Sequence, residues 1–216
     1  MKACIFDLDG VLVDTAKYHF IAWKNLANKL AVDFTEQDNE QLKGLSREAS
    51  LEYILKKGNI SASIDQREEW KEAKNQEYLQ LVLGMQEDEL LPNVLGLLND
   101  LQLHGVKIAL GSASKNAQLI LERVGIKKYF DSIIDGTKTS RSKPDPEVFL
   151  LGAKELQVSP NECVVFEDAI SGIEAAKTAG FFAIGIGEPN VLMNADVVLP
   201  NLINLDVQTI KKYFNK

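Results

Sequence analysis

Two carboxylates, Asp7 and Asp9, directly follow a short apolar run near the start of the chain. Residues 3–6, Ala-Cys-Ile-Phe, are typical of a strand that is buried on both faces. Side chains two positions apart on a strand point to the same side. We therefore expect both acids together at the carboxyl edge of a sheet, where open α/β proteins bind their ligands. Gly10 can adopt the positive φ that turns the chain back across this edge.

A pair of neighbouring carboxylates requires a positive charge close by. Two such anions repel by about 4 kcal/mol at ~4 Å and an effective dielectric constant of ~20. Mg²⁺, which prefers oxygen ligands, is the natural cation for such a place. The pair alone leaves open a second reading, in which solvated acids mark an ordinary turn, because Asp-x-Asp-Gly is also a common turn sequence.

The composition is that of a soluble globular protein: 216 residues, 45% hydrophobic and 25% charged, enough for one large domain or two unequal ones. A net charge of -7 argues against nonspecific binding to nucleic acid or to an anionic membrane. No apolar run is long enough to cross a bilayer, and we find no secretory signal. Cys4 and Cys163 are expected to be buried, reduced thiols, which favours a cytoplasmic protein. Nothing in the sequence demands more than a monomer.

Residues 16–85 contain helical patterns and no convincing buried strand. One helix is expected from Ala16 to Leu30, and a second begins at Ser46, with Glu48 in its first turn. The segment Ser63-Ile64-Asp65-Gln66 has the spacing of a capping box that opens another helix. We therefore predict an inserted helical cap domain of about four helices over residues 15–86, between the two parts of the core at 1–14 and 87–216.

The rest of the chain alternates between helices and strands. Strands are expected at 106–110, 133–134, 163–166 and 182–186. Helices are expected at 93–104, in the segment that ends at Val124, at 147–156, and after a cap formed by Ser171 to Glu174. A single helical turn is expected at 159–162. This alternation indicates right-handed βαβ units and an α/β fold with a doubly wound parallel sheet of the Rossmann-like kind.

Four polar features fall at predicted strand ends or in the loops beyond them: Asp7 with Asp9, then Ser112, then Lys143, and then Glu167 with Asp168. They suit phosphoryl transfer, because a carboxylate can accept a phosphoryl group as an aspartyl-phosphate. A cation and a lysine neutralise the charge on the phosphate, and a second carboxyl can protonate the leaving oxygen.

Four segments, in this order, resemble the motifs of the haloacid dehalogenase superfamily: Phe-Asp-Leu-Asp-Gly-Val-Leu-Val-Asp-Thr at 6–15, Ser112 after its strand, Ser-Lys-Pro-Asp-Pro at 142–146 and Glu-Asp at 167–168. The resemblance implies Asp7 as the nucleophile and Asp9 as the general acid and base. It also implies Mg²⁺ held by Asp7, the Asp9 backbone carbonyl and Asp168, with Glu167 tuning the metal site. The phosphate-binding residues would be Ser112, Ala113 and Lys143.

Residues of the predicted cap resemble one subfamily of this superfamily, the sugar-phosphate mutases. The segments that carry the likeness are 18–20, 41–51 and 112–116, together with Trp23. A mutase that works through a sugar bisphosphate needs two phosphate sites, and Arg47 offers a planar fork for the second phosphate. Lys74 would face the sugar. The full set of implied substrate-binding residues is Thr15, His19, Trp23, Lys43, Gly44, Leu45, Ser46, Arg47, Lys74, Ser114 and Asn116.

The resemblance implies an isomerase that converts β-glucose 1-phosphate into glucose 6-phosphate through the 1,6-bisphosphate. The core motifs alone do not separate a mutase from a sugar-phosphate phosphatase, since only the acceptor differs. A noncatalytic Mg²⁺-binding module that senses phosphorylation is a third possibility. Structural roles also remain open for several residues: packing for His19 and Trp23, and a solvated helix face for Lys43, Arg47 and Lys74. The isomer of the Lys143-Pro144 bond is likewise open.

Overall fold

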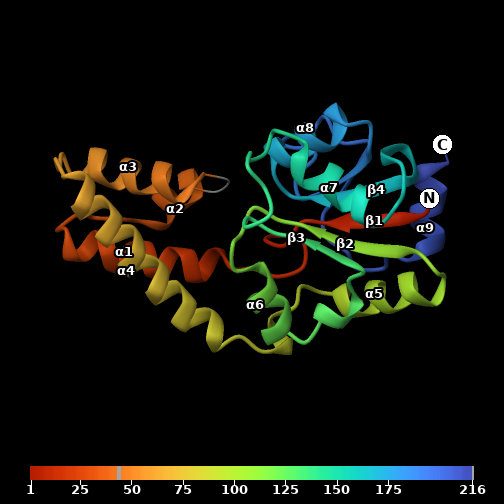
Figure 1. Cartoon of the computed structure of the whole chain (residues 1–216), viewed down its shortest axis with the longest axis horizontal. Coiled ribbons are helices and arrows are strands. Elements are labelled where there is room, and N and C mark those ends of the chain that lie inside the picture. The colour runs from red at the N-terminus through yellow and green to blue at the C-terminus, as the bar shows by residue number, and fades with distance from the viewer. Residues whose placement is uncertain (43–44, 216) are drawn as a thin grey trace. The chain divides into compact units, whose positions relative to one another are not determined.

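The structure, a computed structural model, describes residues 1–42 and 45–215. It consists of two compact units (Figure 1). The core unit contains Met1–Asp14 and Gln86–Lys216, and the cap unit contains Thr15–Met85. The cap unit therefore ends at Met85, one residue before the predicted boundary.

The core unit is built on a parallel sheet with the strand order β3-β2-β1-β4-β5-β6. The strands are β1 (Ala3–Phe6), β2 (Lys107–Gly111), β3 (Ser132–Ile134), β4 (Cys163–Glu167), β5 (Phe182–Ile186) and β6 (Val197–Leu199). The chain adds β2 and β3 on one side of β1 and then β4 to β6 on the other. This reversal confirms the predicted doubly wound fold, and it makes the carboxyl end of β1 the place where a ligand is expected.

Helices cover both faces of this sheet (Figure 1). On one face lie α5 (Val94–Leu103) and α6 (Ala117–Arg123), and on the other lie α7 (Glu147–Glu155) and α8 (Ile170–Thr178). A buried apolar cluster that includes Ile5, Val165 and Phe149 joins the sheet to the α7 and α8 side. The last helix, α9 (Val207–Phe214), packs against α5. A sheet buried on both faces explains why β1 is apolar throughout.

The cap unit is helical over its described residues: α1 (Ala16–Lys29), α2 (Glu36–Leu42), α3 (Arg47–Lys57) and α4 (Ile64–Leu83). Two predicted helix starts are confirmed. The Ser46 hydroxyl accepts the Ala49 N–H, and Ser63 with Gln66 forms the capping box. The apolar faces of the helices enclose a core that includes Trp23 and Leu51.

The structure corrects one predicted helix start. Ser171 does not cap α8, because that helix begins at Ile170 with Ala169 at its N-cap position. The turn before the helix is held instead by Glu167, whose carboxylate accepts the Ala169 N–H at 3.1 Å. The sequence analysis also missed α2, β6 and α9, and short 3₁₀ turns lie at Glu87–Glu89, Lys127–Tyr129 and Pro160–Glu162, the last of them predicted.

Candidate active site

Asp7 lies at the centre of the carboxyl edge of the sheet. Its N–H donates to the Phe166 carbonyl at 2.9 Å, so the pairing of β1 with β4 continues into the site. The Asp7 residue is only 7% exposed. Three residues further on, Gly10 has a φ of +75°, the positive value that the sequence analysis expected for this turn. A Cβ at Gly10 would lie 2.0 Å from an Asp168 carboxylate oxygen, so only glycine lets this turn pass so close to Asp168.

Three carboxylates from two neighbouring strands converge at this point. Asp7, Glu167 and Asp168 each place one oxygen so that all three atoms lie within 4.8 Å of one another. They meet because β1 and β4 pair in register, with Phe6 opposite Phe166. The side chain of Asp9 is not a member of this group.

Lys143 reaches this cluster from the loop that precedes α7. Its ammonium donates to Asp7 Oδ1 at 2.5 Å and to Glu167 Oε2 at 2.7 Å. Burial by itself lowers the pKa of Lys143, but the two carboxylates outweigh burial and raise this pKa well above its ordinary value. Lys143 is therefore charged at any physiological pH. The Lys143-Pro144 peptide bond is cis.

One lysine does not neutralise three carboxylates. Burial, together with repulsion from Asp7 and Glu167, raises the pKa of Asp168 to about 8. Burial is also the main cause that raises the pKa of Glu167, which is 1% exposed. A divalent cation would relieve this excess of negative charge, and a donor set made of oxygen atoms fits Mg²⁺. The acidic residues present therefore fit the expected metal.

The loop after β2 lies at the same edge of the sheet and is held by local hydrogen bonds. The N–H of Ser112, a residue 1% exposed, donates to the Ile134 carbonyl at 3.0 Å. The Ser112 hydroxyl accepts the Ser114 N–H at 3.1 Å, and the Ser114 hydroxyl accepts the Asn116 N–H at 3.2 Å. Ala113, between them, is exposed. These hydrogen bonds order the loop that carries the predicted phosphate-binding residues Ser112 and Ala113 at the carboxyl end of β2.

In the cap unit, Lys74 lies in a buried aromatic setting. Its ammonium is 2.8 Å from His19 Nδ1 and lies over the rings of Trp23 and Tyr78, at 4.7 and 4.8 Å from their centroids. Burial, followed by repulsion from Arg47, lowers the pKa of Lys74 to about 7. Burial and Lys74 hold the pKa of His19 well below its usual range, so His19 is neutral in its hydrogen bond with Lys74.

Arg47, at the start of α3, is oriented by a neighbour on α4. An Arg47 Nη donates to the Asn75 side-chain oxygen at 2.8 Å. Asn75 and Tyr78 were missing from the predicted site, although both belong to the segment Lys74-Asn75-Gln76-Glu77-Tyr78 that drew attention to Lys74. Both follow Lys74 on the same helix, by one and by four positions, and this closeness was the signal that could have added them to the predicted site.

The other predicted cap residues divide into three groups. Thr15 is buried at the N-cap position of α1. Ser46 caps α3, and Leu45 is exposed. Lys43 and Gly44 lie outside the described residues, so the structure does not bear on them.

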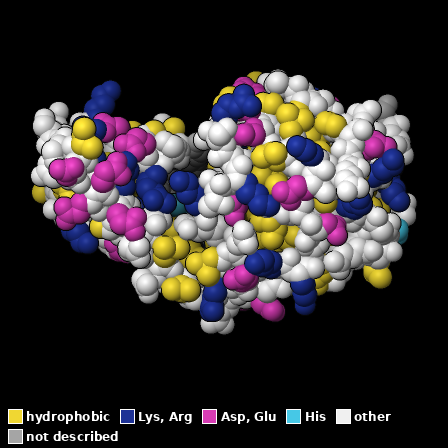
Figure 2. All heavy atoms as spheres, viewed as in Figure 1, with side chains coloured by type: hydrophobic (Ala, Val, Ile, Leu, Met, Phe, Trp, Pro, Cys, Tyr) yellow, Lys and Arg dark blue, Asp and Glu magenta, His cyan; other side chains and the backbone are white. Residues whose placement is uncertain are grey.

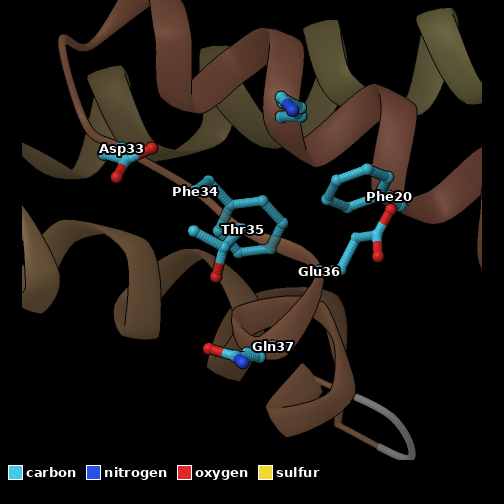
Figure 3. A pocket seen from close by; sticks show the side chains of 7 residues that line it. Phe20, Asp33, Phe34, Thr35, Glu36 and Gln37 are labelled. Atoms are coloured by element: carbon cyan, nitrogen blue, oxygen red, sulfur yellow. The ribbon is translucent and has the colours of Figure 1, made fainter.

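A shallow pocket on the cap unit is lined by residues of α1 and of the segment before and at the start of α2 (Figure 3). The rings of Phe20 and Phe34 lie side by side there, with centroids 6.1 Å apart, and Asp33 and Glu36 lie around them. None of the predicted substrate residues lines this pocket.

On the face of the core unit drawn in Figure 2, Lys and Arg side chains are scattered among acidic and apolar ones. Among the described residues, no helix combines the length and apolarity needed to span a membrane.

Comparisons with known proteins agree with this geometry. Residues 1–180 match the haloacid dehalogenase-like hydrolase family. The chain is 42% identical to β-phosphoglucomutase of Bacillus subtilis over 97% of this chain and 94% of that one. It is 32% identical to a phosphorylated carbohydrates phosphatase of Thermotoga maritima, over 83% of this chain and 82% of that one. The crystal structure of β-phosphoglucomutase from Clostridium difficile superposes with a TM-score of 0.92 at 41% identity, covering 100% of this chain and 97% of that one. The chain therefore belongs to the haloacid dehalogenase-like hydrolase family, as its motifs predicted.

Proposed function

We propose that this protein is a β-phosphoglucomutase, an isomerase that interconverts β-D-glucose 1-phosphate and D-glucose 6-phosphate through β-glucose 1,6-bisphosphate. The observation that carries the proposal is the near-full-length likeness to β-phosphoglucomutases, at 42% and 41% identity. The carboxylate cluster with its lysine supports the same chemistry from the side of the structure.

Asp7 is the nucleophile of this mechanism. One of its oxygens attacks the phosphorus of a sugar phosphate, the bond between phosphorus and the sugar oxygen breaks, and the phosphoryl group becomes an aspartyl-phosphate. In the reverse step the group passes to a sugar hydroxyl. Lys143 and the loop at Ser112–Ala113 would neutralise and hold the phosphoryl oxygens, which is the larger part of catalysis in phosphoryl transfer.

Asp9 is the general acid and base. It removes the proton from the sugar 6-hydroxyl when that oxygen accepts the phosphoryl group, and it returns a proton to the C1 oxygen when the second transfer frees it. The sugar bisphosphate formed between the two transfers must turn over, so that the phosphate at C1 meets Asp7. The net reaction moves one phosphoryl group from C1 to C6 and consumes no water.

Asp7, Asp168 and the Asp9 carbonyl would hold Mg²⁺, with Glu167 adjusting the site. When bound, the metal supplies charge neutralisation for the phosphate and its surroundings. Lys143 shares that task with its fixed charge, because it contacts both Asp7 and Glu167.

Arg47 would bind the phosphate that is not being transferred, and Lys74 would face the sugar. Support comes from the Asn75 contact, which orients the guanidinium, and from the cationic character of the cap residues around Lys74. The two buried cysteines are free thiols, which supports a reducing compartment such as the cytoplasm. We also propose that the protein acts as a monomer, because the mechanism requires a single chain.

A sugar-phosphate phosphatase is the second candidate, favoured by the 32% identity to the Thermotoga maritima phosphatase. Both candidates use the same aspartyl-phosphate and differ only in whether a sugar hydroxyl or water accepts the group.

One incubation separates the two candidates. The protein is mixed with β-glucose 1-phosphate, Mg²⁺ and a trace of the 1,6-bisphosphate, and both glucose 6-phosphate and inorganic phosphate are measured. The mutase gives glucose 6-phosphate with little free phosphate. Stoichiometric phosphate without glucose 6-phosphate would instead identify a phosphatase.

A further inference from the structure

Lys143 differs from the other core site residues in how it is placed. Asp7 and Glu167 are held by strand pairing at the sheet edge, whereas Lys143 belongs to the irregular segment 135–146 between β3 and α7. A lysine side chain has four flexible bonds, so a loop that moved would misplace its ammonium. Some feature of the chain has to fix this loop.

Glu147, the first residue of α7, is the group that does so. Its carboxylate turns back toward the loop and accepts the backbone N–H groups of Ser140 at 2.9 Å and of Arg141 at 2.7 Å. The Ser140 hydroxyl lies 2.9 Å from one carboxylate oxygen and 3.2 Å from the other. These contacts join the two ends of the segment 140–147, so that Lys143 lies in a loop closed by hydrogen bonds. Hydrogen bonds to an ionised carboxylate are among the strong ones.

The helix end does not need Glu147 for its own capping. Asp145 already accepts the Glu147 N–H at 3.0 Å, and its N–H donates to the Ser142 carbonyl at 3.0 Å. Arg141 also pairs with Asp145 at 2.8 Å. The Glu147 carboxylate is therefore directed to the loop and not to the helix terminus, and its hydrogen bonds keep its pKa below the ordinary value.

We propose that Glu147 is a positioning residue for Lys143: by tying Ser140 and Arg141 to the first turn of α7, it fixes the loop from which Lys143 reaches Asp7 and Glu167. This inference rests on the role given to Lys143 in the proposed function. It adds a residue that contacts neither the phosphate nor the metal cluster.

The test compares Glu147→Ala and Glu147→Gln with Glu155→Ala. Glu155 is the control, since it lies at the other end of α7 and accepts from Ser132 and from Lys138, near the start of the segment 135–146, so that its hydrogen bonds lie outside residues 140–147. Limited trypsin digestion reports on the loop directly, because Arg141 is exposed and is followed by Ser142, whereas Lys143 precedes a proline and resists cleavage. Mg²⁺-dependent turnover of an aryl phosphate is measured in parallel, with its dependence on Mg²⁺ concentration.

Glu147→Ala should speed cleavage after Arg141 and lower kcat/KM by about 10- to 100-fold, the loss expected when a catalytic group is misplaced by about 1 Å. The Mg²⁺ concentration for half-maximal activity should not rise, because a displaced Lys143 leaves Asp7 and Glu167 with one positive charge fewer, whereas a general loss of structure would raise it. Glu147→Gln should recover part of the activity, and Glu155→Ala should match the wild type in both assays.

Wild-type cleavage or wild-type turnover in Glu147→Ala would overturn the proposal, and so would an equal effect of Glu155→Ala. Failure of the mutase assignment has a different signature. In that case β-glucose 1-phosphate yields free phosphate and no glucose 6-phosphate, while the Glu147 variants still lose aryl phosphate turnover.

Discussion

The core and cap units position their candidate site residues by different means. In the core, strands that pair in parallel bring Asp7 and Glu167 to one edge, and Lys143 reaches them from the loop before α7, across 136 and 24 residues of sequence. In the cap, Lys74 meets His19 across 55 residues and Arg47 meets Asn75 across 28, through helix packing. The convergence of the strand ends follows from the fold class alone, whereas the contacts of Lys143 and those of the cap residues depend on particular side chains.

The candidate site residues of the two units also differ in the sign of their charge. The core gathers three carboxylates around one lysine, and the pKa of Asp168 is raised to about 8, chiefly by burial and then by its acidic neighbours. The cap gathers Lys74 and Arg47, and the pKa of Lys74 is lowered to about 7, chiefly by burial and then by Arg47. The core is therefore suited to a cation and the cap to an anion such as a phosphate. A net charge of -7 for the chain conceals this division.

The strongest test of the core is Asp7→Asn. The amide cannot attack phosphorus as a carboxylate does, so phosphoenzyme formation and turnover should both fall by about 10⁴-fold or more. Acid-quenched labelling with a ³²P phosphodonor measures the first, and glucose 6-phosphate formation measures the second. Substantial activity in this variant would remove Asp7 as the nucleophile.

The matching test of the cap is Arg47→Ala, with Arg47→Lys as the control for charge. Loss of a charged, bidentate donor costs about 1.5–3 kcal/mol, roughly 10- to 100-fold, in the use of the bisphosphate. Hydrolysis of a simple aryl phosphate, which has no second phosphate, should change much less. An unchanged ratio of the two activities would reject Arg47 as the second phosphate site.

The pH dependence of Mg²⁺ binding tests the charge of the core. A carboxyl whose pKa is raised on folding contributes stability that is full below its unfolded value of 3.8 and is lost as pH rises toward about 8 for Asp168. Mg²⁺ binds the ionised form, so saturating Mg²⁺ should raise Tm by several degrees more near pH 8 than near pH 6. Differential scanning calorimetry with and without a chelator measures this, and Asp168→Asn should abolish the difference.

Lys74→Met tests the opposite charge of the cap and has the smallest expected effect. Because the pKa of Lys74 is about 7 in the folded chain and 10.5 in a free lysine, the unfolded state binds more protons between these values. The free energy of unfolding of the wild type should therefore rise with pH across this interval relative to Lys74→Met. Urea denaturation measures the two slopes, and Lys56→Met, which removes an exposed lysine of α3, is the control. Equal slopes in wild type and Lys74→Met would contradict the buried setting of Lys74.

Much of the core could be predicted because its signals are local. The apolar run before Asp7 marks a buried strand, and the glycines after the helices mark their ends, with positive φ at Gly105, Gly125 and Gly180. The predictions failed where two signals competed. Ser171 resembles a helix cap, but the site residue Glu167 holds the turn instead. Asp206, which does cap α9 by accepting the Thr209 N–H at 2.7 Å, was a signal that the sequence analysis overlooked.

The cap site was less accessible from sequence. Arg47 and Lys74 were named through resemblance, because a lysine or arginine on a helix is more often part of a solvated face. Asn75 gave no chemical signal by itself, and its contact with Arg47 follows only from the packing of α3 against α4.

By itself, the sequence determined the order of the elements, the acidic strand ends and the family, since each depends on neighbouring residues and on motifs that can be read along the chain. Only the tertiary structure decided which polar groups meet: that Lys143 contacts both Asp7 and Glu167, that His19 is hydrogen-bonded with Lys74, and that Glu147 holds the loop of Lys143. The reason is physical. Electrostatic and hydrogen-bond energies depend on distances of a few ångströms and on burial, and both arise only when segments far apart in the chain pack together.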